Sequence, residues 1–157
     1  MKTLFRLMLI VLVLLPGYAY GQQRKKELAN ILEKKYQVIY HNIKVDEDGK
    51  YLVTGFFEDS IRVGNQTFKS RGITDAFFAR FDKNLNMEWF KLAGGNHVNL
   101  VKLLHTDVNN NIYISGMFKG LVYFEDTIIQ SPGSYNYFTA KYNDRGDLIW
   151  IMQNQLK

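Results

Sequence analysis

The sequence contains no cysteine among its 157 residues. This absence excludes disulfide bonds, thiolate metal sites and cysteine nucleophiles. It also excludes lipid attachment through a cysteine at a signal cleavage site. The fold must therefore be held together by packing alone.

Histidine is also scarce, and the spacing of the three residues does not indicate chemistry. His41, His97 and His105 form none of the closely spaced His and Glu patterns that favour a zinc site. The chain also lacks a Gly-x-Ser-x-Gly motif and a phosphate-binding glycine loop. Isolated histidines are more often structural than functional. The sequence therefore predicts a protein that is not an enzyme, with no catalytic residue, metal ligand or cofactor, and with unknown ligand-binding residues.

The excess of positive charge is small and local. Of the net charge of +5, Lys2 and Arg6 account for two, and the basic segment 22–35 accounts for the other three. From Tyr36 onward, 13 basic residues are matched by 13 acidic ones, whereas a nucleic-acid-binding protein shows basic clustering on its folded part. We therefore expect no nucleic-acid partner. We interpret segment 22–35 as solvated, with a short helix over 27–35, and a membrane-surface or polyanion role is the alternative.

The first 21 residues have the pattern of a cleavable signal peptide. Lys2 and Arg6 precede the apolar run Leu7–Leu15, and Ala19 and Gly21 are the small residues expected before a cleavage site. Nine apolar residues would cover about 14 Å as a helix, about half of a bilayer core. A buried helix is the alternative. The sequence thus predicts an exported protein, periplasmic, at the cell surface or extracellular, with no stable membrane span.

The remaining chain consists of two copies of a repeat, offset by 61 residues. Residues 46–91 align without a gap with residues 107–152. The eight identical pairs are Asp46/Asp107, Gly55/Gly116, Phe57/Phe118, Ser70/Ser131, Gly72/Gly133, Phe77/Phe138, Ala79/Ala140 and Trp89/Trp150. Conservative pairs such as Arg80/Lys141 lie between them. We expect equivalent positions to share environments, and we expect Phe77, Ala79 and Trp89 to be buried together with their counterparts.

Apolar residues alternate with a period of two inside each copy, which predicts strands rather than helices. Phe77, Ala79 and Phe81 share one face of a strand, and turn residues separate the strands at short intervals. A glycine inside the equivalent strands, Gly55 and Gly116, suggests a bulge or a close approach of backbones. The predicted strands are 37–45, 50–57, 75–82 and 87–92, then 99–106, 111–118, 136–143 and 148–152, with hairpins near 61–68 and 122–129. Four antiparallel strands per copy form the unit of a propeller blade.

These motifs resemble a known bacterial repeat. The carriers are Asp107-x-Asn109-Asn110-Asn111-Ile112-Tyr113-Ile114-Ser115-Gly116, then Asn136-Tyr137-Phe138-Thr139-Ala140-Lys141-Tyr142, then Trp89 followed by Gly94-Gly95. They are similar to the SBBP-type β-propeller repeats of secreted and surface proteins of the Bacteroidetes. The resemblance implies an all-β fold of two four-stranded antiparallel blades, an incomplete propeller, with blade repeats at 36–97 and 98–157.

Two features of the repeat leave alternatives open. Asp46-x-Asp48-Gly49, Asp82-x-Asn84-x-Asn86 and Asp107-x-Asn109-x-Asn111 place oxygen atoms at alternate positions, as calcium sites do. The same residues suit tight turns, which we favour because no motif is complete. The aromatic residues, 15% of the chain, could stack on sugars, but their repeat-equivalent strand positions favour a core role.

The sequence thus favours an exported binding module whose partner is a protein or glycan at the cell envelope, engaged through loops at one end of the blades. The alternative is a structural scaffold fragment or a remnant of a longer surface propeller protein. Because two blades cannot close a ring, they leave strand edges open. We therefore expect self-association, with closure by three or four chains as the simplest arrangement.

Overall fold

A computed structural model describes residues 19–96 and 100–155. The predicted signal peptide lies almost entirely outside these residues, as does His97. No helix among the described residues is both long enough and apolar enough to span a membrane.

The basic segment forms a helix that is longer than predicted. Residues 19–31 are α-helical, and the helix continues as the π-helical turn η1 (Leu32–Tyr36). The interpretation of this segment as fully solvated is wrong, since Leu28 and Leu32 are 0% and 1% exposed. Apolar residues at 28, 32 and 36 recur every four positions and so share one helix face. We call residues 19–36 the N-terminal helix.

The predicted strands are confirmed within a few residues of their ends. The first copy contains β1 (Ile39–Val45), β2 (Tyr51–Phe57), β3 (Ser60–Val63), β4 (Gln66–Lys69), β5 (Asp75–Phe81) and β6 (Met87–Gly95). The second contains β7 (Leu100–Thr106), β8 (Ile112–Phe118), β9 (Leu121–Phe124), β10 (Thr127–Gln130), β11 (Asn136–Tyr142) and β12 (Leu148–Gln155). Each strand of the second copy begins 61 residues after its counterpart, as Leu100 does after Ile39.

The protein is all-β with antiparallel sheets, but the sheets are not two sets of four strands. Their sizes are six (β1-β2-β5-β6-β9-β10), four (β12-β11-β8-β7) and two (β3-β4). The difference arises because the second copy's hairpin pairs with the free edge of β6, through Gly94↔Tyr123 and Gly95↔Val122. A Cβ on Gly95 would lie 1.9 Å from the Leu121 carbonyl oxygen, so glycine permits this pairing. The pairing covers part of an edge that would otherwise be open.

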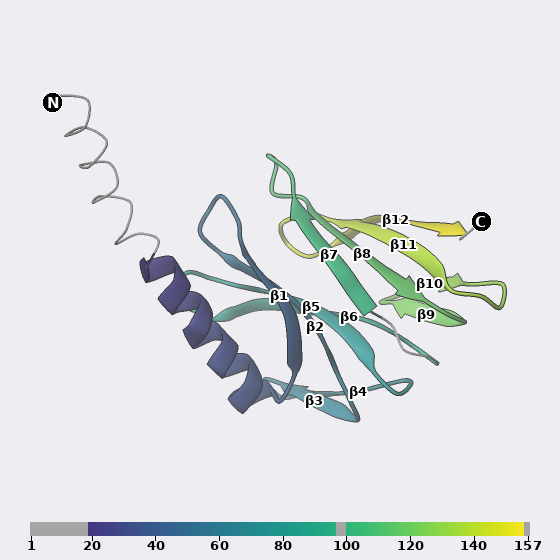
Figure 1. The fold of residues 1–157 in the computed structure, drawn as a ribbon, viewed down its shortest axis with the longest axis horizontal. Helices are drawn as coiled ribbons and strands as arrows, with labels where there is room; N and C mark the ends of the chain where they lie inside the picture. The colour runs from purple at the N-terminus through teal and green to yellow at the C-terminus, as the bar shows by residue number, and fades with distance from the viewer. Residues whose placement is uncertain (1–18, 97–99, 156–157) are drawn as a thin grey trace, which may run out of the picture.

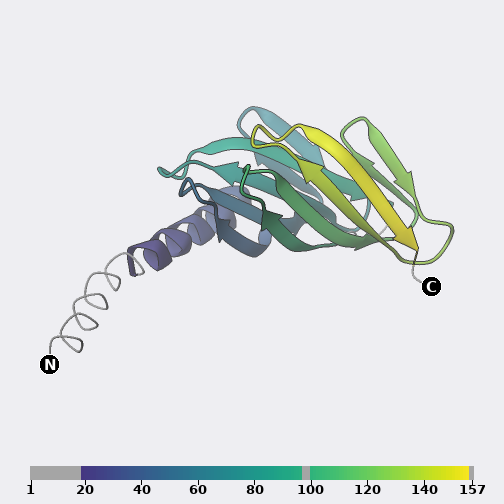
Figure 2. The ribbon, with the colours of Figure 1, turned by 90° about the horizontal axis from the view of Figure 1, so that it is seen from above.

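The elements stack in three layers, in the order N-terminal helix, first sheet (β1-β2-β5-β6) and second sheet (β7-β8-β11-β12), which can be followed in Figure 1 and, from above, in Figure 2. One hydrophobic core lies between the helix and the first sheet, and the other lies between the two sheets. Strand β5 is therefore buried at every position, whereas its counterpart β11 alternates between buried and more exposed residues.

Each sheet has two faces, which we name by the order of the layers. The leading face points toward the preceding layer and the trailing face toward the next. The leading faces carry Tyr51, Val53, Phe57, Phe77, Ala79 and Phe81 in the first sheet, and Ile112, Ile114, Phe118, Phe138, Ala140 and Tyr142 in the second. The trailing faces carry Leu52, Thr54, Ala76, Phe78, Arg80 and Trp89 in the first sheet, and Tyr113, Ser115, Tyr137, Thr139, Lys141 and Trp150 in the second.

Equivalent positions share their environment on the leading faces but not on the trailing ones. The predicted burial of Phe77 and Ala79 is confirmed together with that of their counterparts, all at 2% exposure or less. The predicted burial of Trp89 and Trp150 is wrong, because both are partly exposed. Trp89 packs at the margin of the inter-sheet core, while Trp150 lies on a face that no layer covers among the described residues.

The glycine inside each central strand sits opposite a bulge, as predicted. Gly55 pairs with Tyr40, where the register of β1 shifts, and Gly116 pairs with Val101, where the register of β7 shifts. A Cβ on Gly55 would meet the Ile39 carbonyl oxygen at 2.2 Å. Glycine therefore allows the bulged strand to approach closely.

Candidate interaction face

The histidines are not brought together. His41 is exposed beside Phe56, with ring centroids 5.1 Å apart, and His105 is exposed beside Tyr113 at 6.4 Å. Among residues 19–96 and 100–155, no three His, Asp or Glu side chains form a cluster that could hold a metal ion. That the protein has no catalytic residue, metal or cofactor remains a prediction.

The Asp and Asn motifs form turns, as the favoured interpretation predicts. Asp107 Oδ1 accepts hydrogen bonds from the backbone N–H groups of Asn109 and Asn111, at 3.0 and 2.9 Å. Asp82 makes the same contacts with Asn84 and Asn86. Such bonds mimic a backbone turn and stabilise the ionised carboxylate. The hydrogen bond from the Asn111 side chain is the main cause that lowers the pKa of Asp107 to about 2.

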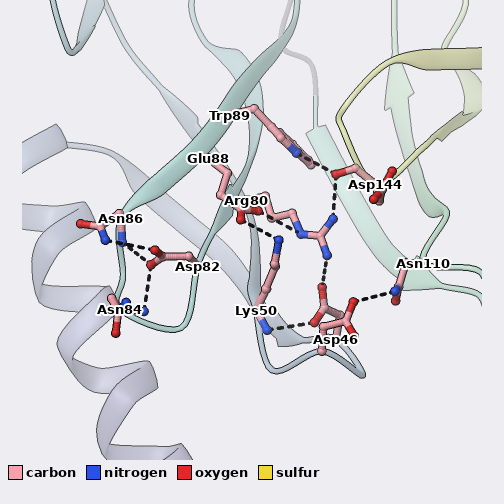
Figure 3. A network of polar contacts seen from close by, with 11 residues as sticks. Asp46, Lys50, Arg80, Asp82, Asn84, Asn86, Glu88, Trp89, Asn110 and Asp144 are labelled. Atoms are coloured by element: carbon pink, nitrogen blue, oxygen red, sulfur yellow. Dashed lines mark hydrogen bonds and ion pairs between the residues drawn. The ribbon is translucent and has the colours of Figure 1, made fainter.

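A buried polar cluster joins the two sheets at the end where these turns lie, as Figure 3 shows. The Arg80 guanidinium, on the trailing face of the first sheet, donates to Asp46 Oδ2 at 2.6 Å and to the backbone carbonyl of Asp144 at 2.7 Å. The indole N–H of Trp89 donates to the same carbonyl at 3.1 Å. The side chains of Arg80 and Asp46 are 3% and 1% exposed.

Asp144 belongs to the turn between β11 and β12, so these bonds fasten the first repeat to the second. A second link joins the β1–β2 and β7–β8 turns, where the Asn110 side chain donates to Asp48 Oδ2 at 2.8 Å. Fully paired polar groups between packed layers fix their relative register, because leaving any one unpaired would be costly.

The second repeat carries the same kind of ion pair without a covering layer. Lys141 lies 3.8 Å from Asp107, and their side chains are 20% and 25% exposed. The Lys141 ammonium lies 5.1 Å from the ring centroid of Tyr113, which is 6.0 Å from the Trp150 ring. The Tyr113 hydroxyl donates to Asp107 Oδ2 at 3.1 Å.

These residues form the centre of the candidate interaction face, defined as the trailing face of the second sheet (Tyr113, Ser115, Tyr137, Thr139, Lys141 and Trp150). Ser115 and Thr139 share a hydrogen bond at 2.9 Å, which leaves the middle of the face mildly polar. Tyr137 is 43% exposed, and Met152, next to the face on β12, is 55% exposed. An exposed patch of aromatic, cationic and hydroxyl groups is typical of protein interaction surfaces.

Sequence reasoning did not single out this face. The signal was present in the conservative pair Arg80/Lys141 and in the identical pair Trp89/Trp150. Their functional difference depends on which sheet lies above them, and a repeat alignment does not contain that information.

One cavity, of about 360 Å³, lies where β9 joins β6. The Arg71 guanidinium lies 4.3 Å from the Tyr123 ring centroid at its border, and the buried Asp75 carboxylate accepts hydrogen bonds from the Ser70 hydroxyl and the Arg71 N–H. Burial raises the pKa of Asp75. These contacts hold the hairpin against the first sheet, so we assign the cavity to that joint rather than to a ligand.

Comparison with known proteins gives a distant similarity to a repeat protein. No protein-family model matches the chain. An uncharacterised WD repeat-containing protein of Acanthamoeba polyphaga mimivirus is 27% identical over 133 residues, which covers 70% of this chain and 9% of that protein. The chain thus spans less than a tenth of the length of this relative. The similarity suggests a repeat family of the β-propeller-like kind, in agreement with the two equivalent four-stranded units of the fold.

Proposed function

We propose that this protein is an exported, non-catalytic interaction module that binds a protein partner at the cell envelope through the candidate interaction face. The observation that carries the proposal is the internal repeat. The trailing face of the first sheet already binds a β-sheet layer, and the trailing face of the second sheet presents the equivalent tryptophan and a cation, Trp150 and Lys141.

The chemistry of the face favours a protein over a glycan. In the first repeat, the equivalent groups Arg80 and Trp89 both donate to a backbone carbonyl. A polypeptide turn offers such a carbonyl, and Lys141 and Trp150 can donate to it in the same manner. Trp150 stands edge-on to Tyr113, with an interplanar angle of 66°. The two rings therefore do not form the flat platform that a sugar ring would stack on.

The finer family and the location belong to this proposal as well. The SBBP-type resemblance of the repeat and its Bacteroidetes character rest on the motifs quoted above. Export rests on residues 1–21, and the mimivirus relative bears only on the repeat character of the chain. The name of that relative, a WD repeat protein, supports a repeat-based interaction role.

A structural role is the second candidate. The relative is more than ten times as long as the region it shares with this chain. Two repeats could therefore serve as part of a larger repeat assembly rather than as an independent binder.

Site-specific photo-crosslinking in envelope extracts of the source organism tests the proposed function. A photoreactive residue at Tyr137 should capture a defined protein, and the same residue at Ile73, an exposed loop position at 70% exposure, should not. The Lys141→Glu substitution should abolish capture at 137. Capture that is equal at both positions, or unaffected by K141E, would contradict the proposal. Retention on immobilised envelope glycans that Trp150→Ala removes would favour the glycan alternative.

A further inference from the structure

The N-terminal helix occupies the place of a preceding repeat. In the second repeat, the core on the leading face is completed by side chains of the first sheet, namely Leu52, Ala76, Phe78 and Ala93. In the first repeat, the equivalent core is completed by side chains that precede β1, namely Leu28, Leu32, Tyr36 and Val38. The helix thus covers the face that, in the second repeat, docks onto another sheet.

The resemblance extends to a single guanidinium contact. Arg80 donates to the backbone carbonyl of Asp144, in the β11–β12 turn, at 2.7 Å. Arg24 in the helix donates to the backbone carbonyl of Lys83 at 2.6 Å. Lys83 lies in the β5–β6 turn and is the repeat equivalent of Asp144, since the two positions differ by 61. The helix therefore presents an arginine to the same carbonyl that a preceding repeat would contact.

An aromatic contact repeats in the same position. Phe78 of the first sheet packs against Tyr142 with ring centroids 4.7 Å apart. The repeat equivalent of Tyr142 is Phe81, and its ring meets Tyr36 of the helix at 6.4 Å. Tyr36 thus takes the part of Phe78, as Arg24 takes the part of Arg80.

We propose that the N-terminal helix is a releasable stand-in for a preceding repeat, and that its release allows the leading face of the first sheet to dock onto the candidate interaction face of a second copy of this chain. This inference rests on the proposed function, because it assigns a partner and a control to the same face. The helix-bound chain is then monomeric, and assembly is head to tail.

The choice of a second copy as partner follows from the repeat. Docking would join a leading face to a trailing face, which is the contact that already holds the two sheets together within one chain. Lys141 of one copy would replace Arg24 at the Lys83 carbonyl of the other. The ring closure predicted from sequence requires this leading face to be open, so it also requires the helix to leave.

The helix is the weaker of the two coverings. Its ion pair, Arg24–Glu27, joins side chains that are 20% and 41% exposed, whereas Arg80 and Asp46 are almost fully buried. Exposed ion pairs contribute little to stability because water and salt screen them. A single helix also makes fewer inter-strand contacts than a sheet, so its release costs less than separation of the sheets.

Size-exclusion chromatography with light scattering on the purified exported chain tests the inference. Wild type should be monomeric, and Leu28→Asp/Leu32→Asp should associate into dimers or larger species as its concentration rises. The matched control, Lys26→Asp/Lys34→Asp, changes solvent-facing positions of the same helix and should stay monomeric. Adding K141E to the L28D/L32D variant should return it to monomer, and so should an excess of a synthetic peptide of residues 22–38.

Circular dichroism separates specific assembly from unfolding. A folded L28D/L32D variant that stays monomeric would overturn the inference, and so would association that persists with K141E and with the peptide. If the aspartate variant unfolds, Arg24→Ala/Leu28→Ala replaces it with the same expected outcomes. Because these measurements use only the purified chain, their failure is distinguishable from a failure to crosslink an envelope partner at position 137.

Discussion

Arg80 and Lys141 hold equivalent positions in the two repeats, yet their side chains are 3% and 20% exposed. Both face an aspartate of the preceding turn, Asp46 and Asp107. The second sheet covers the Arg80 pair and supplies a carbonyl from Asp144. Among the described residues, no layer covers the Lys141 pair. The same pattern of residues therefore forms a structural joint in one repeat and an accessible surface in the other.

Removal of Arg80 should destabilise the protein strongly. The Arg80→Ala substitution leaves the Asp46 carboxylate buried without its charge partner, which costs roughly 3–5 kcal/mol in such sites. Lys141→Ala is the matched control at the equivalent position, and its effect should be much smaller because water solvates Asp107. Urea denaturation followed by tryptophan fluorescence measures both changes. Similar losses for the two variants would contradict the assignment of Arg80 as the joint between the sheets.

Stability should fall in acid partly through Asp107. Its pKa is lowered to about 2, first by the Asn111 side chain, so the folded state favours the ionised form. The resulting stability is present above the ordinary value of 3.8 and is lost as the pH falls from about 4 to about 2.

Asp107→Asn is a suitable variant for this test, because Asn143 makes the same turn contacts in the β11–β12 turn. Thermal unfolding measured between pH 2 and 7 should show a shallower acid loss for D107N than for wild type. Some slope should remain, since hydrogen bonds from Asn86 also lower the pKa of Asp82. An unchanged slope would show that Asp107 is not responsible.

A methyl group at Gly55 should be poorly tolerated. The added Cβ would meet the Ile39 carbonyl oxygen at 2.2 Å and Tyr40 Cα at 2.8 Å, and both are backbone atoms of the bulged β1 strand. Forcing the strand away should cost about 1–3 kcal/mol or more. Gly21→Ala is the control, because nothing lies within 4 Å of the Cβ that it adds. Denaturation midpoints compare the two, and equal midpoints would exclude close approach at the bulge.

The strands and turns could be predicted from sequence because their signals are local. Alternation of Phe77, Ala79 and Phe81 sets a strand face, and Asp82 or Asp107 sets a turn through its own backbone. The constant offset of 61 residues then gives the second copy from the first.

The packing between elements could not be predicted in the same way. Leu28 and Leu32 share one helix face, but the sequence does not say which sheet face they cover. The pairing of β9 with β6 depends on backbone groups and on the absence of a side chain at Gly95, so it leaves little trace in a hydrophobic pattern. The unequal surroundings of Arg80 and Lys141 arise from the order of the layers. Identical or similar residues in a repeat are therefore weak evidence of identical roles.

Processing of the N-terminus should leave the stand-in helix intact. Ala19 and Gly21 predict cleavage before Gln22, and the first helical side chain that contacts the first sheet through a printed bond is Arg24. Cleavage there would remove residues 1–21 while keeping Arg24, Leu28, Leu32 and Tyr36. Intact mass spectrometry of protein recovered from the exported fraction should match residues 22–157. Retention of Met1 in that fraction would contradict cleavage, and a start beyond residue 24 would remove the arginine that contacts the Lys83 carbonyl.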